Sequence, residues 1–262
     1  MSLLRRRLDL GWRLFGTGFS FFCFGVGALI ISISVFPVIS LLSPQRDRRR
    51  RRIQRAMRRV MSLFVWLMKT LGIITCDIRG AEKLRAPGQL VIANHPSLID
   101  VVILIALMPE VDCIVKQALW RNPFLRWPVS WAGYIPNRGP ENLVEACAAS
   151  LRAGRSLIVF PEGTRTVPGE ALQLKRGAAQ IALAAGCDVR PVRITVTPPM
   201  LSKRQAWYWV PPKPGHWDIE VGDRIGADRI AALGSLSGLA ARRLTRHFVD
   251  RLSGDPNAPS AV

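Results

Sequence analysis

The stretch LVIANHPSLID, residues 90–100, places a polar Asn-His pair and an acid between two apolar runs. The run LVIA is short and continuous, which is typical of a buried strand. The second run, VVILIALM, follows Asp100 directly and has the length of a helix. We therefore predict a strand at Leu90–Ala93, a helix at Leu98–Met108, and a polar turn between them.

Residues 76–252 continue this alternation of short apolar strands and helical segments. Strands that alternate with helices indicate an α/β domain with a largely parallel sheet and flanking helices. Ligands bind to such sheets at the carboxyl ends of the strands. Residues 253–262 are predicted to form a flexible tail. The further strands are predicted at Cys113–Val115, Leu157–Phe160 and Val189–Val196, and the further helices at Asn142–Arg152 and Leu174–Ala185.

An uncharged stretch between Arg13 and Arg46 is long enough for one bilayer crossing, which takes about 20 residues. It is too long for the apolar part of a signal peptide, and no small-x-small cleavage site precedes the following arginines. Residues 1–75 are therefore predicted to form a helical membrane anchor with a basic juxtamembrane helix, in which Val60–Thr75 is amphipathic or buried.

The arginines around this stretch predict its orientation. They are denser after it than before it, which places the bulk of the chain on the cytoplasmic side of the inner membrane. A single crossing would export the first arginines, whereas a re-entrant hairpin broken at Pro37 would keep both ends inside. The sequence leaves both topologies open.

The formal net charge of +19 indicates an anionic partner, either nucleic acid or an acidic membrane surface. The run RDRRRRRIQRAMRR, residues 46–59, lies beside the apolar stretch. There it favours anionic lipid headgroups, at about 1 kcal/mol per charge, and no nucleic acid partner is expected. The five cysteines are scattered without a CxxC pair, so we expect reduced thiols and no metal site.

Two interpretations of His95 and Asp100 stay open. Ser97-Leu98-Ile99-Asp100 fits the S-x-x-[DE] capping pattern, in which the acid only stabilises the start of a helix. Alternatively, His95 in the turn meets Asp100 in the first helical turn, and the carboxylate fixes the imidazole tautomer. The sequence has no Gly-x-Ser-x-Gly elbow, so such a histidine would activate a substrate hydroxyl.

The hexapeptide FPEGTR, residues 160–165, follows another predicted strand. Its glycine permits a close backbone approach, and Arg165 offers a fork of donors that suits phosphate or carboxylate. A strand-ending turn with a solvated arginine is the plainer interpretation.

Together, NH-x4-D and FPEGTR resemble the glycerolipid acyltransferase family in order and spacing. The resemblance covers about residues 76–200 and implies that His95 and Asp100 are catalytic. It implies that Glu162, Gly163, Thr164 and Arg165 bind the acceptor. The family's middle motif matches Lys116, Gly133, Ile135 and Arg138, of which Lys116 and Arg138 would help to hold the acceptor phosphate.

The resemblance also implies the reaction. His95 takes the proton of a lysophospholipid hydroxyl that attacks the thioester of acyl-CoA or acyl-carrier protein, and no cofactor takes part. Departures from the family pattern at residues 117–119 and 133–138 concern the acceptor, which is either 1-acylglycerol-3-phosphate or another lyso-lipid. A non-catalytic basic module that binds membrane or nucleic acid is the third hypothesis.

Overall fold

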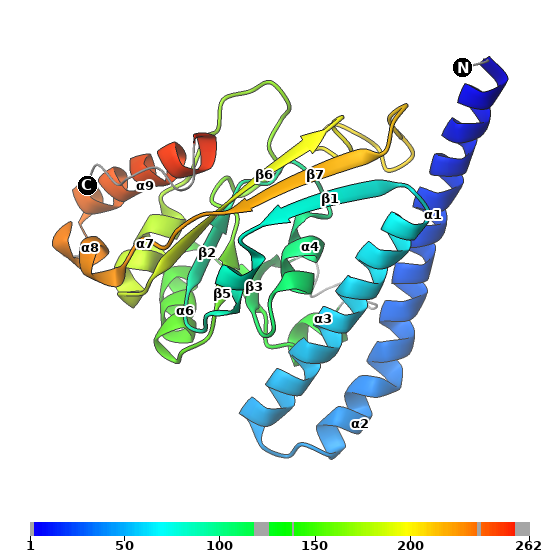
Figure 1. The fold of residues 1–262 in the computed structure, drawn as a ribbon. Helices are drawn as coiled ribbons and strands as arrows, with labels where there is room; N and C mark the ends of the chain where they lie inside the picture. Colours follow the sequence, from blue (N-terminus) through cyan, green and yellow to red (C-terminus); the bar gives the residue numbers. More distant parts are fainter. Residues whose placement is uncertain (1–2, 118–125, 138, 235–236, 255–262) are drawn as a thin grey trace.

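The computed structural model describes residues 3–117, 126–137, 139–234 and 237–254. Its centre is a seven-stranded sheet with the order β1-β7-β6-β2-β5-β3-β4 (Figure 1). Only the pairing of β6 with β7 is antiparallel, so the predicted largely parallel α/β sheet is confirmed. The strands are β1 Ile74–Arg79, β2 Leu90–Ala93, β3 Asp112–Lys116, β4 Ile135–Asn137, β5 Leu157–Val159, β6 Val189–Thr197 and β7 Gly215–Val221.

Helices cover both faces of this sheet. Val91 and Ala93 of β2 belong to a core cluster with residues of α3 and α4, whereas Leu90 and Ile92 pack with residues of α6, α7 and α9. Successive residues of a strand face opposite sides, so the continuous apolar run LVIA is needed to fill both layers. These helices are α3 Arg46–Thr70, α4 Asp100–Leu107, α6 Pro140–Arg152, α7 Gly177–Ala185 and α9 Gly238–Ser253.

The predicted strands and helices of the domain are present, with ends shifted by a few residues. α7 begins at Gly177 and not at Leu174, and α4 begins at Asp100 and not at Leu98. α9 ends at Ser253, where the predicted tail begins, and residues 255–262 of that tail lie outside the described residues. The sequence reading missed β1, β4, β7, α9 and three short helices, which are η1 Ala81–Arg85, α5 Arg126–Trp131 and α8 Ala227–Ala232.

The N-terminal region forms three helices, where the sequence predicted a helical membrane segment followed by a basic juxtamembrane helix. α1 spans Leu3–Ile33, α2 spans Val35–Leu41, and α3 includes the whole arginine run. The predicted helix Val60–Thr75 is wrong at both ends, because α3 begins at Arg46 and ends at Thr70. Gly72 ends it with a φ of 69°, and the Gly72 and Ile73 amides donate to Lys69 and Met68 carbonyls as in a Schellman motif. β1 then begins at Ile74, inside the predicted anchor region.

α3 folds back along α1, and these two helices form the helix pair (Figure 1). α3 also joins this pair to the sheet. Phe64 of α3 lies between Phe21 and Phe24 of α1, at ring distances of 5.8 and 4.9 Å. Nearer its N-terminus, α3 reaches the buried Asp112 at the start of β3. Arg50 pairs with this carboxylate, and the Gln54 amide donates to it at 2.8 Å. α3 is therefore part of the domain's structure as well as the partner of α1.

Candidate active site

Both sequence motifs lie at the carboxyl edge of the sheet because β2 and β5 are parallel neighbours. Ile92 is in register with Val159, so the turn after each strand emerges at the same edge. Asn94 fixes the first turn against β6: its side chain donates to the Ile194 carbonyl and accepts from the Ile194 amide, each at 2.7 Å. The turn that carries His95 is thus held to the sheet on the side opposite β5.

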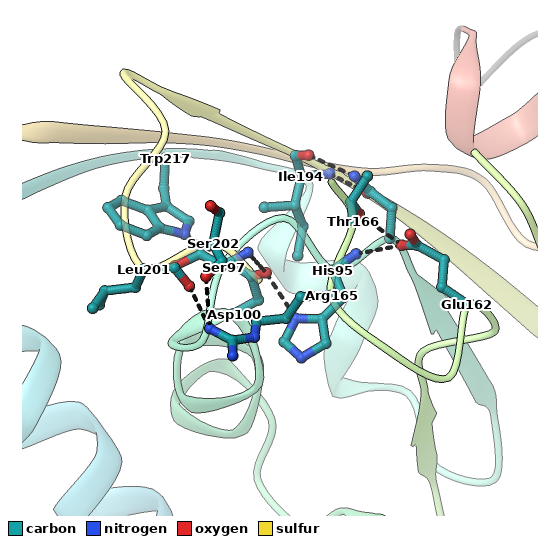
Figure 2. Close-up of polar contacts among 11 residues, drawn as sticks. His95, Ser97, Asp100, Glu162, Arg165, Thr166, Ile194, Leu201, Ser202 and Trp217 are labelled. Atoms are coloured by element: carbon teal, nitrogen blue, oxygen red, sulfur yellow. Dashed lines mark hydrogen bonds and ion pairs between the residues drawn. The ribbon is translucent and has the colours of Figure 1, made fainter. Parts of the chain in front are cut away.

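His95 Nδ1 lies 3.0 Å from Asp100 Oδ2, and Asp100 is completely buried (Figure 2). The same carboxylate accepts the Ser97 amide at 2.7 Å and the Trp217 indole N–H at 2.8 Å. Burial raises the pKa of Asp100 above its ordinary value, while these hydrogen bonds act in the opposite direction. A carboxylate on Nδ1 leaves Nε2 as the nitrogen that can accept a proton.

Asp100 therefore serves both of the roles that the sequence left open. It is the first residue of α4, and its contact with the Ser97 amide is the carboxylate half of a capping box. The Ser97 hydroxyl does not complete the box, since it has no hydrogen-bond partner among the described residues. One carboxylate thus fixes the turn and the imidazole together.

Glu162 joins the two motifs. Its Oε1 accepts the His95 amide at 2.9 Å and the Thr166 hydroxyl at 2.8 Å, and the Thr166 amide donates to the His95 carbonyl at 2.7 Å. Burial raises the pKa of Glu162, and the two hydrogen bonds oppose that shift. The predicted acceptor ligand Glu162 is largely buried and directed at the turn that carries His95. Phe160 stacks on the His95 ring, with 4.2 Å between the centroids.

Glu162, Thr164 and Arg165 of the hexapeptide line a polar cavity of about 340 Å³, together with Glu170, Lys175 and Lys203. Gly163 has a φ of 68°, which places Thr164 on the exposed side of the turn. The Arg165 NH1 donates to the Leu201 and Ser202 carbonyls at 2.8 and 3.0 Å (Figure 2). The orientation of this guanidinium is therefore set by protein contacts.

For two of the residues that the sequence predicted to hold the acceptor phosphate, the described part of the chain leaves the prediction untested. Lys116 is the last residue of β3, at the same edge of the sheet as His95, but the structure does not describe its side chain. Arg138 lies outside the described residues.

Sequence reasoning missed the residues that hold the predicted ones in place. Trp217, in β7, is fully buried and 117 residues away from the Asp100 that it contacts. Leu201 and Ser202 act only through their carbonyls, so their side-chain types give no signal. Thr166 directly follows the FPEGTR motif, and its hydroxyl contact with Glu162 has the i, i+4 spacing of a local turn.

Fold and site together place a hydrogen-bonded His–Asp pair at the carboxyl edge of a largely parallel α/β sheet, a geometry that suits general-base chemistry. The sequence pattern described as Acyltransferase matches residues 75–195. A 1-acyl-sn-glycerol-3-phosphate acyltransferase of Helicobacter pylori is 35% identical over 112 residues, which are 40% of this chain and 47% of that protein. Residues 75–195 are thus similar to the glycerolipid acyltransferases.

Two further comparisons extend this result. A lyso-ornithine lipid O-acyltransferase of Pseudomonas aeruginosa is 33% identical over 135 residues, covering 50% of this chain and 52% of that protein. The matched part of this chain thus spans about half the length of these curated relatives. The crystal structure of the 1-acyl-sn-glycerophosphate acyltransferase PlsC from Thermotoga maritima shares the fold with a TM-score of 0.70 and 22% identity. That alignment covers 94% of this chain and 95% of the other.

Proposed function

We propose that the protein is a membrane-bound O-acyltransferase that esterifies the free hydroxyl of a lysophospholipid. The observation that carries this proposal is the position of the His95–Asp100 pair. Glu162 and Thr166, which contact the His95 backbone, line the polar cavity at Arg165, and residues next to Asp100 line an apolar cavity of about 300 Å³. Leu98 and Ile99, which separate the pair in sequence, line the apolar cavity together with residues of α1, α2 and α3. An amphiphilic substrate has a polar part and an apolar part, and it therefore needs one polar and one apolar cavity.

The reaction moves one proton twice. His95 Nε2 takes the proton of the acceptor hydroxyl while the oxygen attacks the carbonyl carbon of an acyl thioester. The C–S bond then breaks, and the imidazolium returns the proton to the departing thiolate. Asp100 holds the ring and stabilises its charged form throughout. The thioester of acyl-CoA or acyl-carrier protein is a substrate, and this scheme uses no resident cofactor.

The acceptor that we propose first is 1-acylglycerol-3-phosphate, which would give phosphatidic acid. Arg165 supports an anionic headgroup, and Lys175 and Lys203 add positive charge to the same cavity. The similarity to the lyso-ornithine lipid enzyme supports a second candidate, because a guanidinium fork also binds a carboxylate.

We propose that the helix pair lies in one leaflet of the cytoplasmic membrane, with the domain in the cytoplasm. The helical region Arg7–Leu41 is long enough to cross a bilayer and includes an 18-residue window with a mean hydropathy of 2.4. However, Arg52 of α3 donates to Leu42 and Ser43 at the end of α2, so a crossing would carry α3 arginines into the hydrocarbon. An in-plane pair keeps the basic ends of α1 and α3 in the headgroup region.

Thiol release from acyl-CoA in the presence of an acceptor panel tests the activity and the acceptor together. The panel contains lysophosphatidate, other lysophospholipids and lyso-ornithine lipid. We expect acceptor-dependent release that His95→Ala lowers by about 10²–10⁴-fold while vesicle binding and circular dichroism are unchanged. Near-normal turnover in a folded His95→Ala protein would contradict the mechanism, and release without an acceptor would indicate a hydrolase.

A further inference from the structure

The loop that joins β6 to β7, residues 198–214, exposes three consecutive aromatic side chains at its tip. Trp207, Tyr208 and Trp209 are 51%, 57% and 65% exposed. Tryptophan and tyrosine combine an apolar ring with a polar group, which is why they gather at membrane–water interfaces. Three neighbouring rings in solvent therefore indicate a surface that is covered in the working protein.

This tip continues the apolar surface of α1. A Cβ atom at Gly18 would lie 3.2 Å from the Trp207 ring, so the ring rests on the helix backbone. Arg13 of α1 donates to the Pro212 carbonyl at 2.8 Å. α1 itself exposes apolar side chains along its length, including Phe15, Phe19 and Phe22. The aromatic tip and α1 thus form one exposed apolar face.

The charge next to the tip points to the partner. Lys203 and Arg204 precede the aromatic residues in the same loop and are exposed. Apolar rings flanked by basic side chains suit a bilayer surface that carries anionic headgroups. Because the tip adjoins the helix pair, the same bilayer can contact both.

Residues at the base of this loop contact residues of the candidate active site. Leu201 and Ser202 are buried, and their carbonyls accept the Arg165 NH1. The Leu201 carbonyl also accepts the Leu98 amide at 3.1 Å, so it contacts both sequence motifs. Leu201 has a φ of 55°, a left-handed conformation that is rare for a leucine and that needs support from its surroundings. Figure 2 shows the two carbonyls directed at the guanidinium.

We propose that the loop 198–214 docks its aromatic tip on an anionic bilayer and thereby fixes Arg165 for the acceptor. The role of Arg165 in this inference rests on the proposed function. With the tip in the lipid, the loop is held at both ends, and Arg165 meets headgroups that arrive in the plane of the membrane. Arg165 is then a binding residue whose position depends on the bilayer, and the aromatic tip is its positioning element.

The test compares three variants of the full-length protein. Tyr208→Ser/Trp209→Ser removes the two outer rings and leaves the Trp207 contact with α1. Tyr208→Phe/Trp209→Phe keeps the rings. Leu239→Ser is the matched control, since Leu239 is 57% exposed but belongs to α9, away from the tip (Figure 1). Binding is measured with phosphatidylcholine vesicles that contain or lack phosphatidylglycerol, and the KM of each substrate is measured on the same vesicles.

We expect the serine variant to bind acidic vesicles about tenfold more weakly and to need about tenfold more lysophosphatidate at half-saturation. The acyl-donor KM and the activity on a short-chain acceptor dispersed in water should stay within about twofold of wild type. The phenylalanine variant should recover both losses. Wild-type behaviour of the serine variant on acidic vesicles, or equal loss in Leu239→Ser, would overturn the proposal.

Two other outcomes test the membrane contact and the link to Arg165 separately. Weaker vesicle binding with an unchanged acceptor KM, measured when all enzyme is bound, would overturn the link to Arg165. A wild-type protein that transfers no acyl chain to any acceptor would overturn the proposed function and the link together. Loss of vesicle binding in the serine variant would still support the membrane contact, because that assay needs no substrate.

Discussion

Asp100 is the residue at which the contacts of the site converge. Its two oxygens accept from His95, the Ser97 amide and Trp217, so a buried carboxylate has three donors. A buried charge without such partners would be neutralised or would destabilise the fold. The order of the imidazole therefore depends on residues outside the His–Asp pair, and Trp217 is the most remote of them in sequence.

Trp217→Phe should change the pH dependence of transfer. Loss of the indole donor removes a hydrogen bond to the charged form, so the already raised pKa of Asp100 rises further. Because the ionised form supports His95, the acidic limb of the kcat/KM profile should move to higher pH. The unpaired oxygen should also cost about 1–3 kcal/mol of stability. Trp209→Phe, the same change at an exposed position, should alter neither quantity.

Arg165→Lys should raise the acceptor KM by about tenfold and leave the donor KM nearly unchanged. Lysine keeps the charge but loses the planar fork, and it cannot hold two carbonyls and a headgroup together. Lys203→Arg is the matched control, since Lys203 lines the same cavity and the charge is again kept. A defect confined to the donor KM would move Arg165 to the thioester side of the site.

At the residue scale, the sequence predicted the side chains of the candidate site but not the groups that hold them in place. His95, Asp100 and Arg165 belong to motifs with a recognisable order and spacing. Trp217 belongs to no motif, and its contact depends on how β7 returns beside β6. The Leu201 carbonyl is a backbone group, which every residue carries. Such contacts are properties of the folded chain.

At the scale of elements, the prediction succeeded for the strands in the middle of the sheet. β2 and β5 are buried on both faces and form continuous apolar runs. β7, GHWDIEV, alternates between buried and partly exposed residues, and β1 shows a similar alternation. Strands of this kind lack a solid apolar run, and their charged residues obscure the period of two. The antiparallel edge of the sheet was therefore missed.

The end of α3 is an element-scale test of backbone conformation. Gly72→Ala should cost about 1–2 kcal/mol, because φ is 69° there and nothing lies within 4 Å of the added Cβ. The cost is then purely conformational. Gly238→Ala at the start of α9 also meets open space, but its φ suits any residue, so a change within about 0.5 kcal/mol is expected. Urea unfolding in detergent micelles measures both, and equal effects would contradict the role given to Gly72.

For the whole molecule, eight of the nine arginines in the run 46–59 divide into two groups. Arg50 pairs with the buried Asp112, and Arg52, Arg55 and Arg58 also contact protein groups. Arg46, Arg48, Arg51 and Arg59 are exposed along the same helix. One stretch of like charge thus joins α3 to the domain and presents positive charge to its surroundings. The sequence predicted the second role and gave no sign of the first.

Replacing the four exposed arginines with glutamine should weaken binding to acidic vesicles at low salt by at least about 100-fold. Wild-type binding should itself fall as salt rises. Binding to neutral vesicles, which depends on apolar contact, should change little. Arg50→Gln is the control: Arg155, Gln54 and Ser150 still contact Asp112, so it should lower stability by about 1–3 kcal/mol and affect vesicle binding by one charge at most. Equal binding of wild type to neutral and acidic vesicles would contradict the assignment.

The pairing of β1 with β7 also has a consequence for biosynthesis. β1 follows the helix pair directly, but its partner strand β7 ends only at Val221. Trp217, which contacts Asp100, is synthesised 117 residues after it. At about 5–20 residues per second, a ribosome needs roughly 6–23 s to add that stretch. The apolar α1 leaves the ribosome well before this interval begins. The nascent chain therefore presents its apolar N-terminal helices while the site is still incomplete, and under the proposed function it can reach the lipid surface before the first turnover.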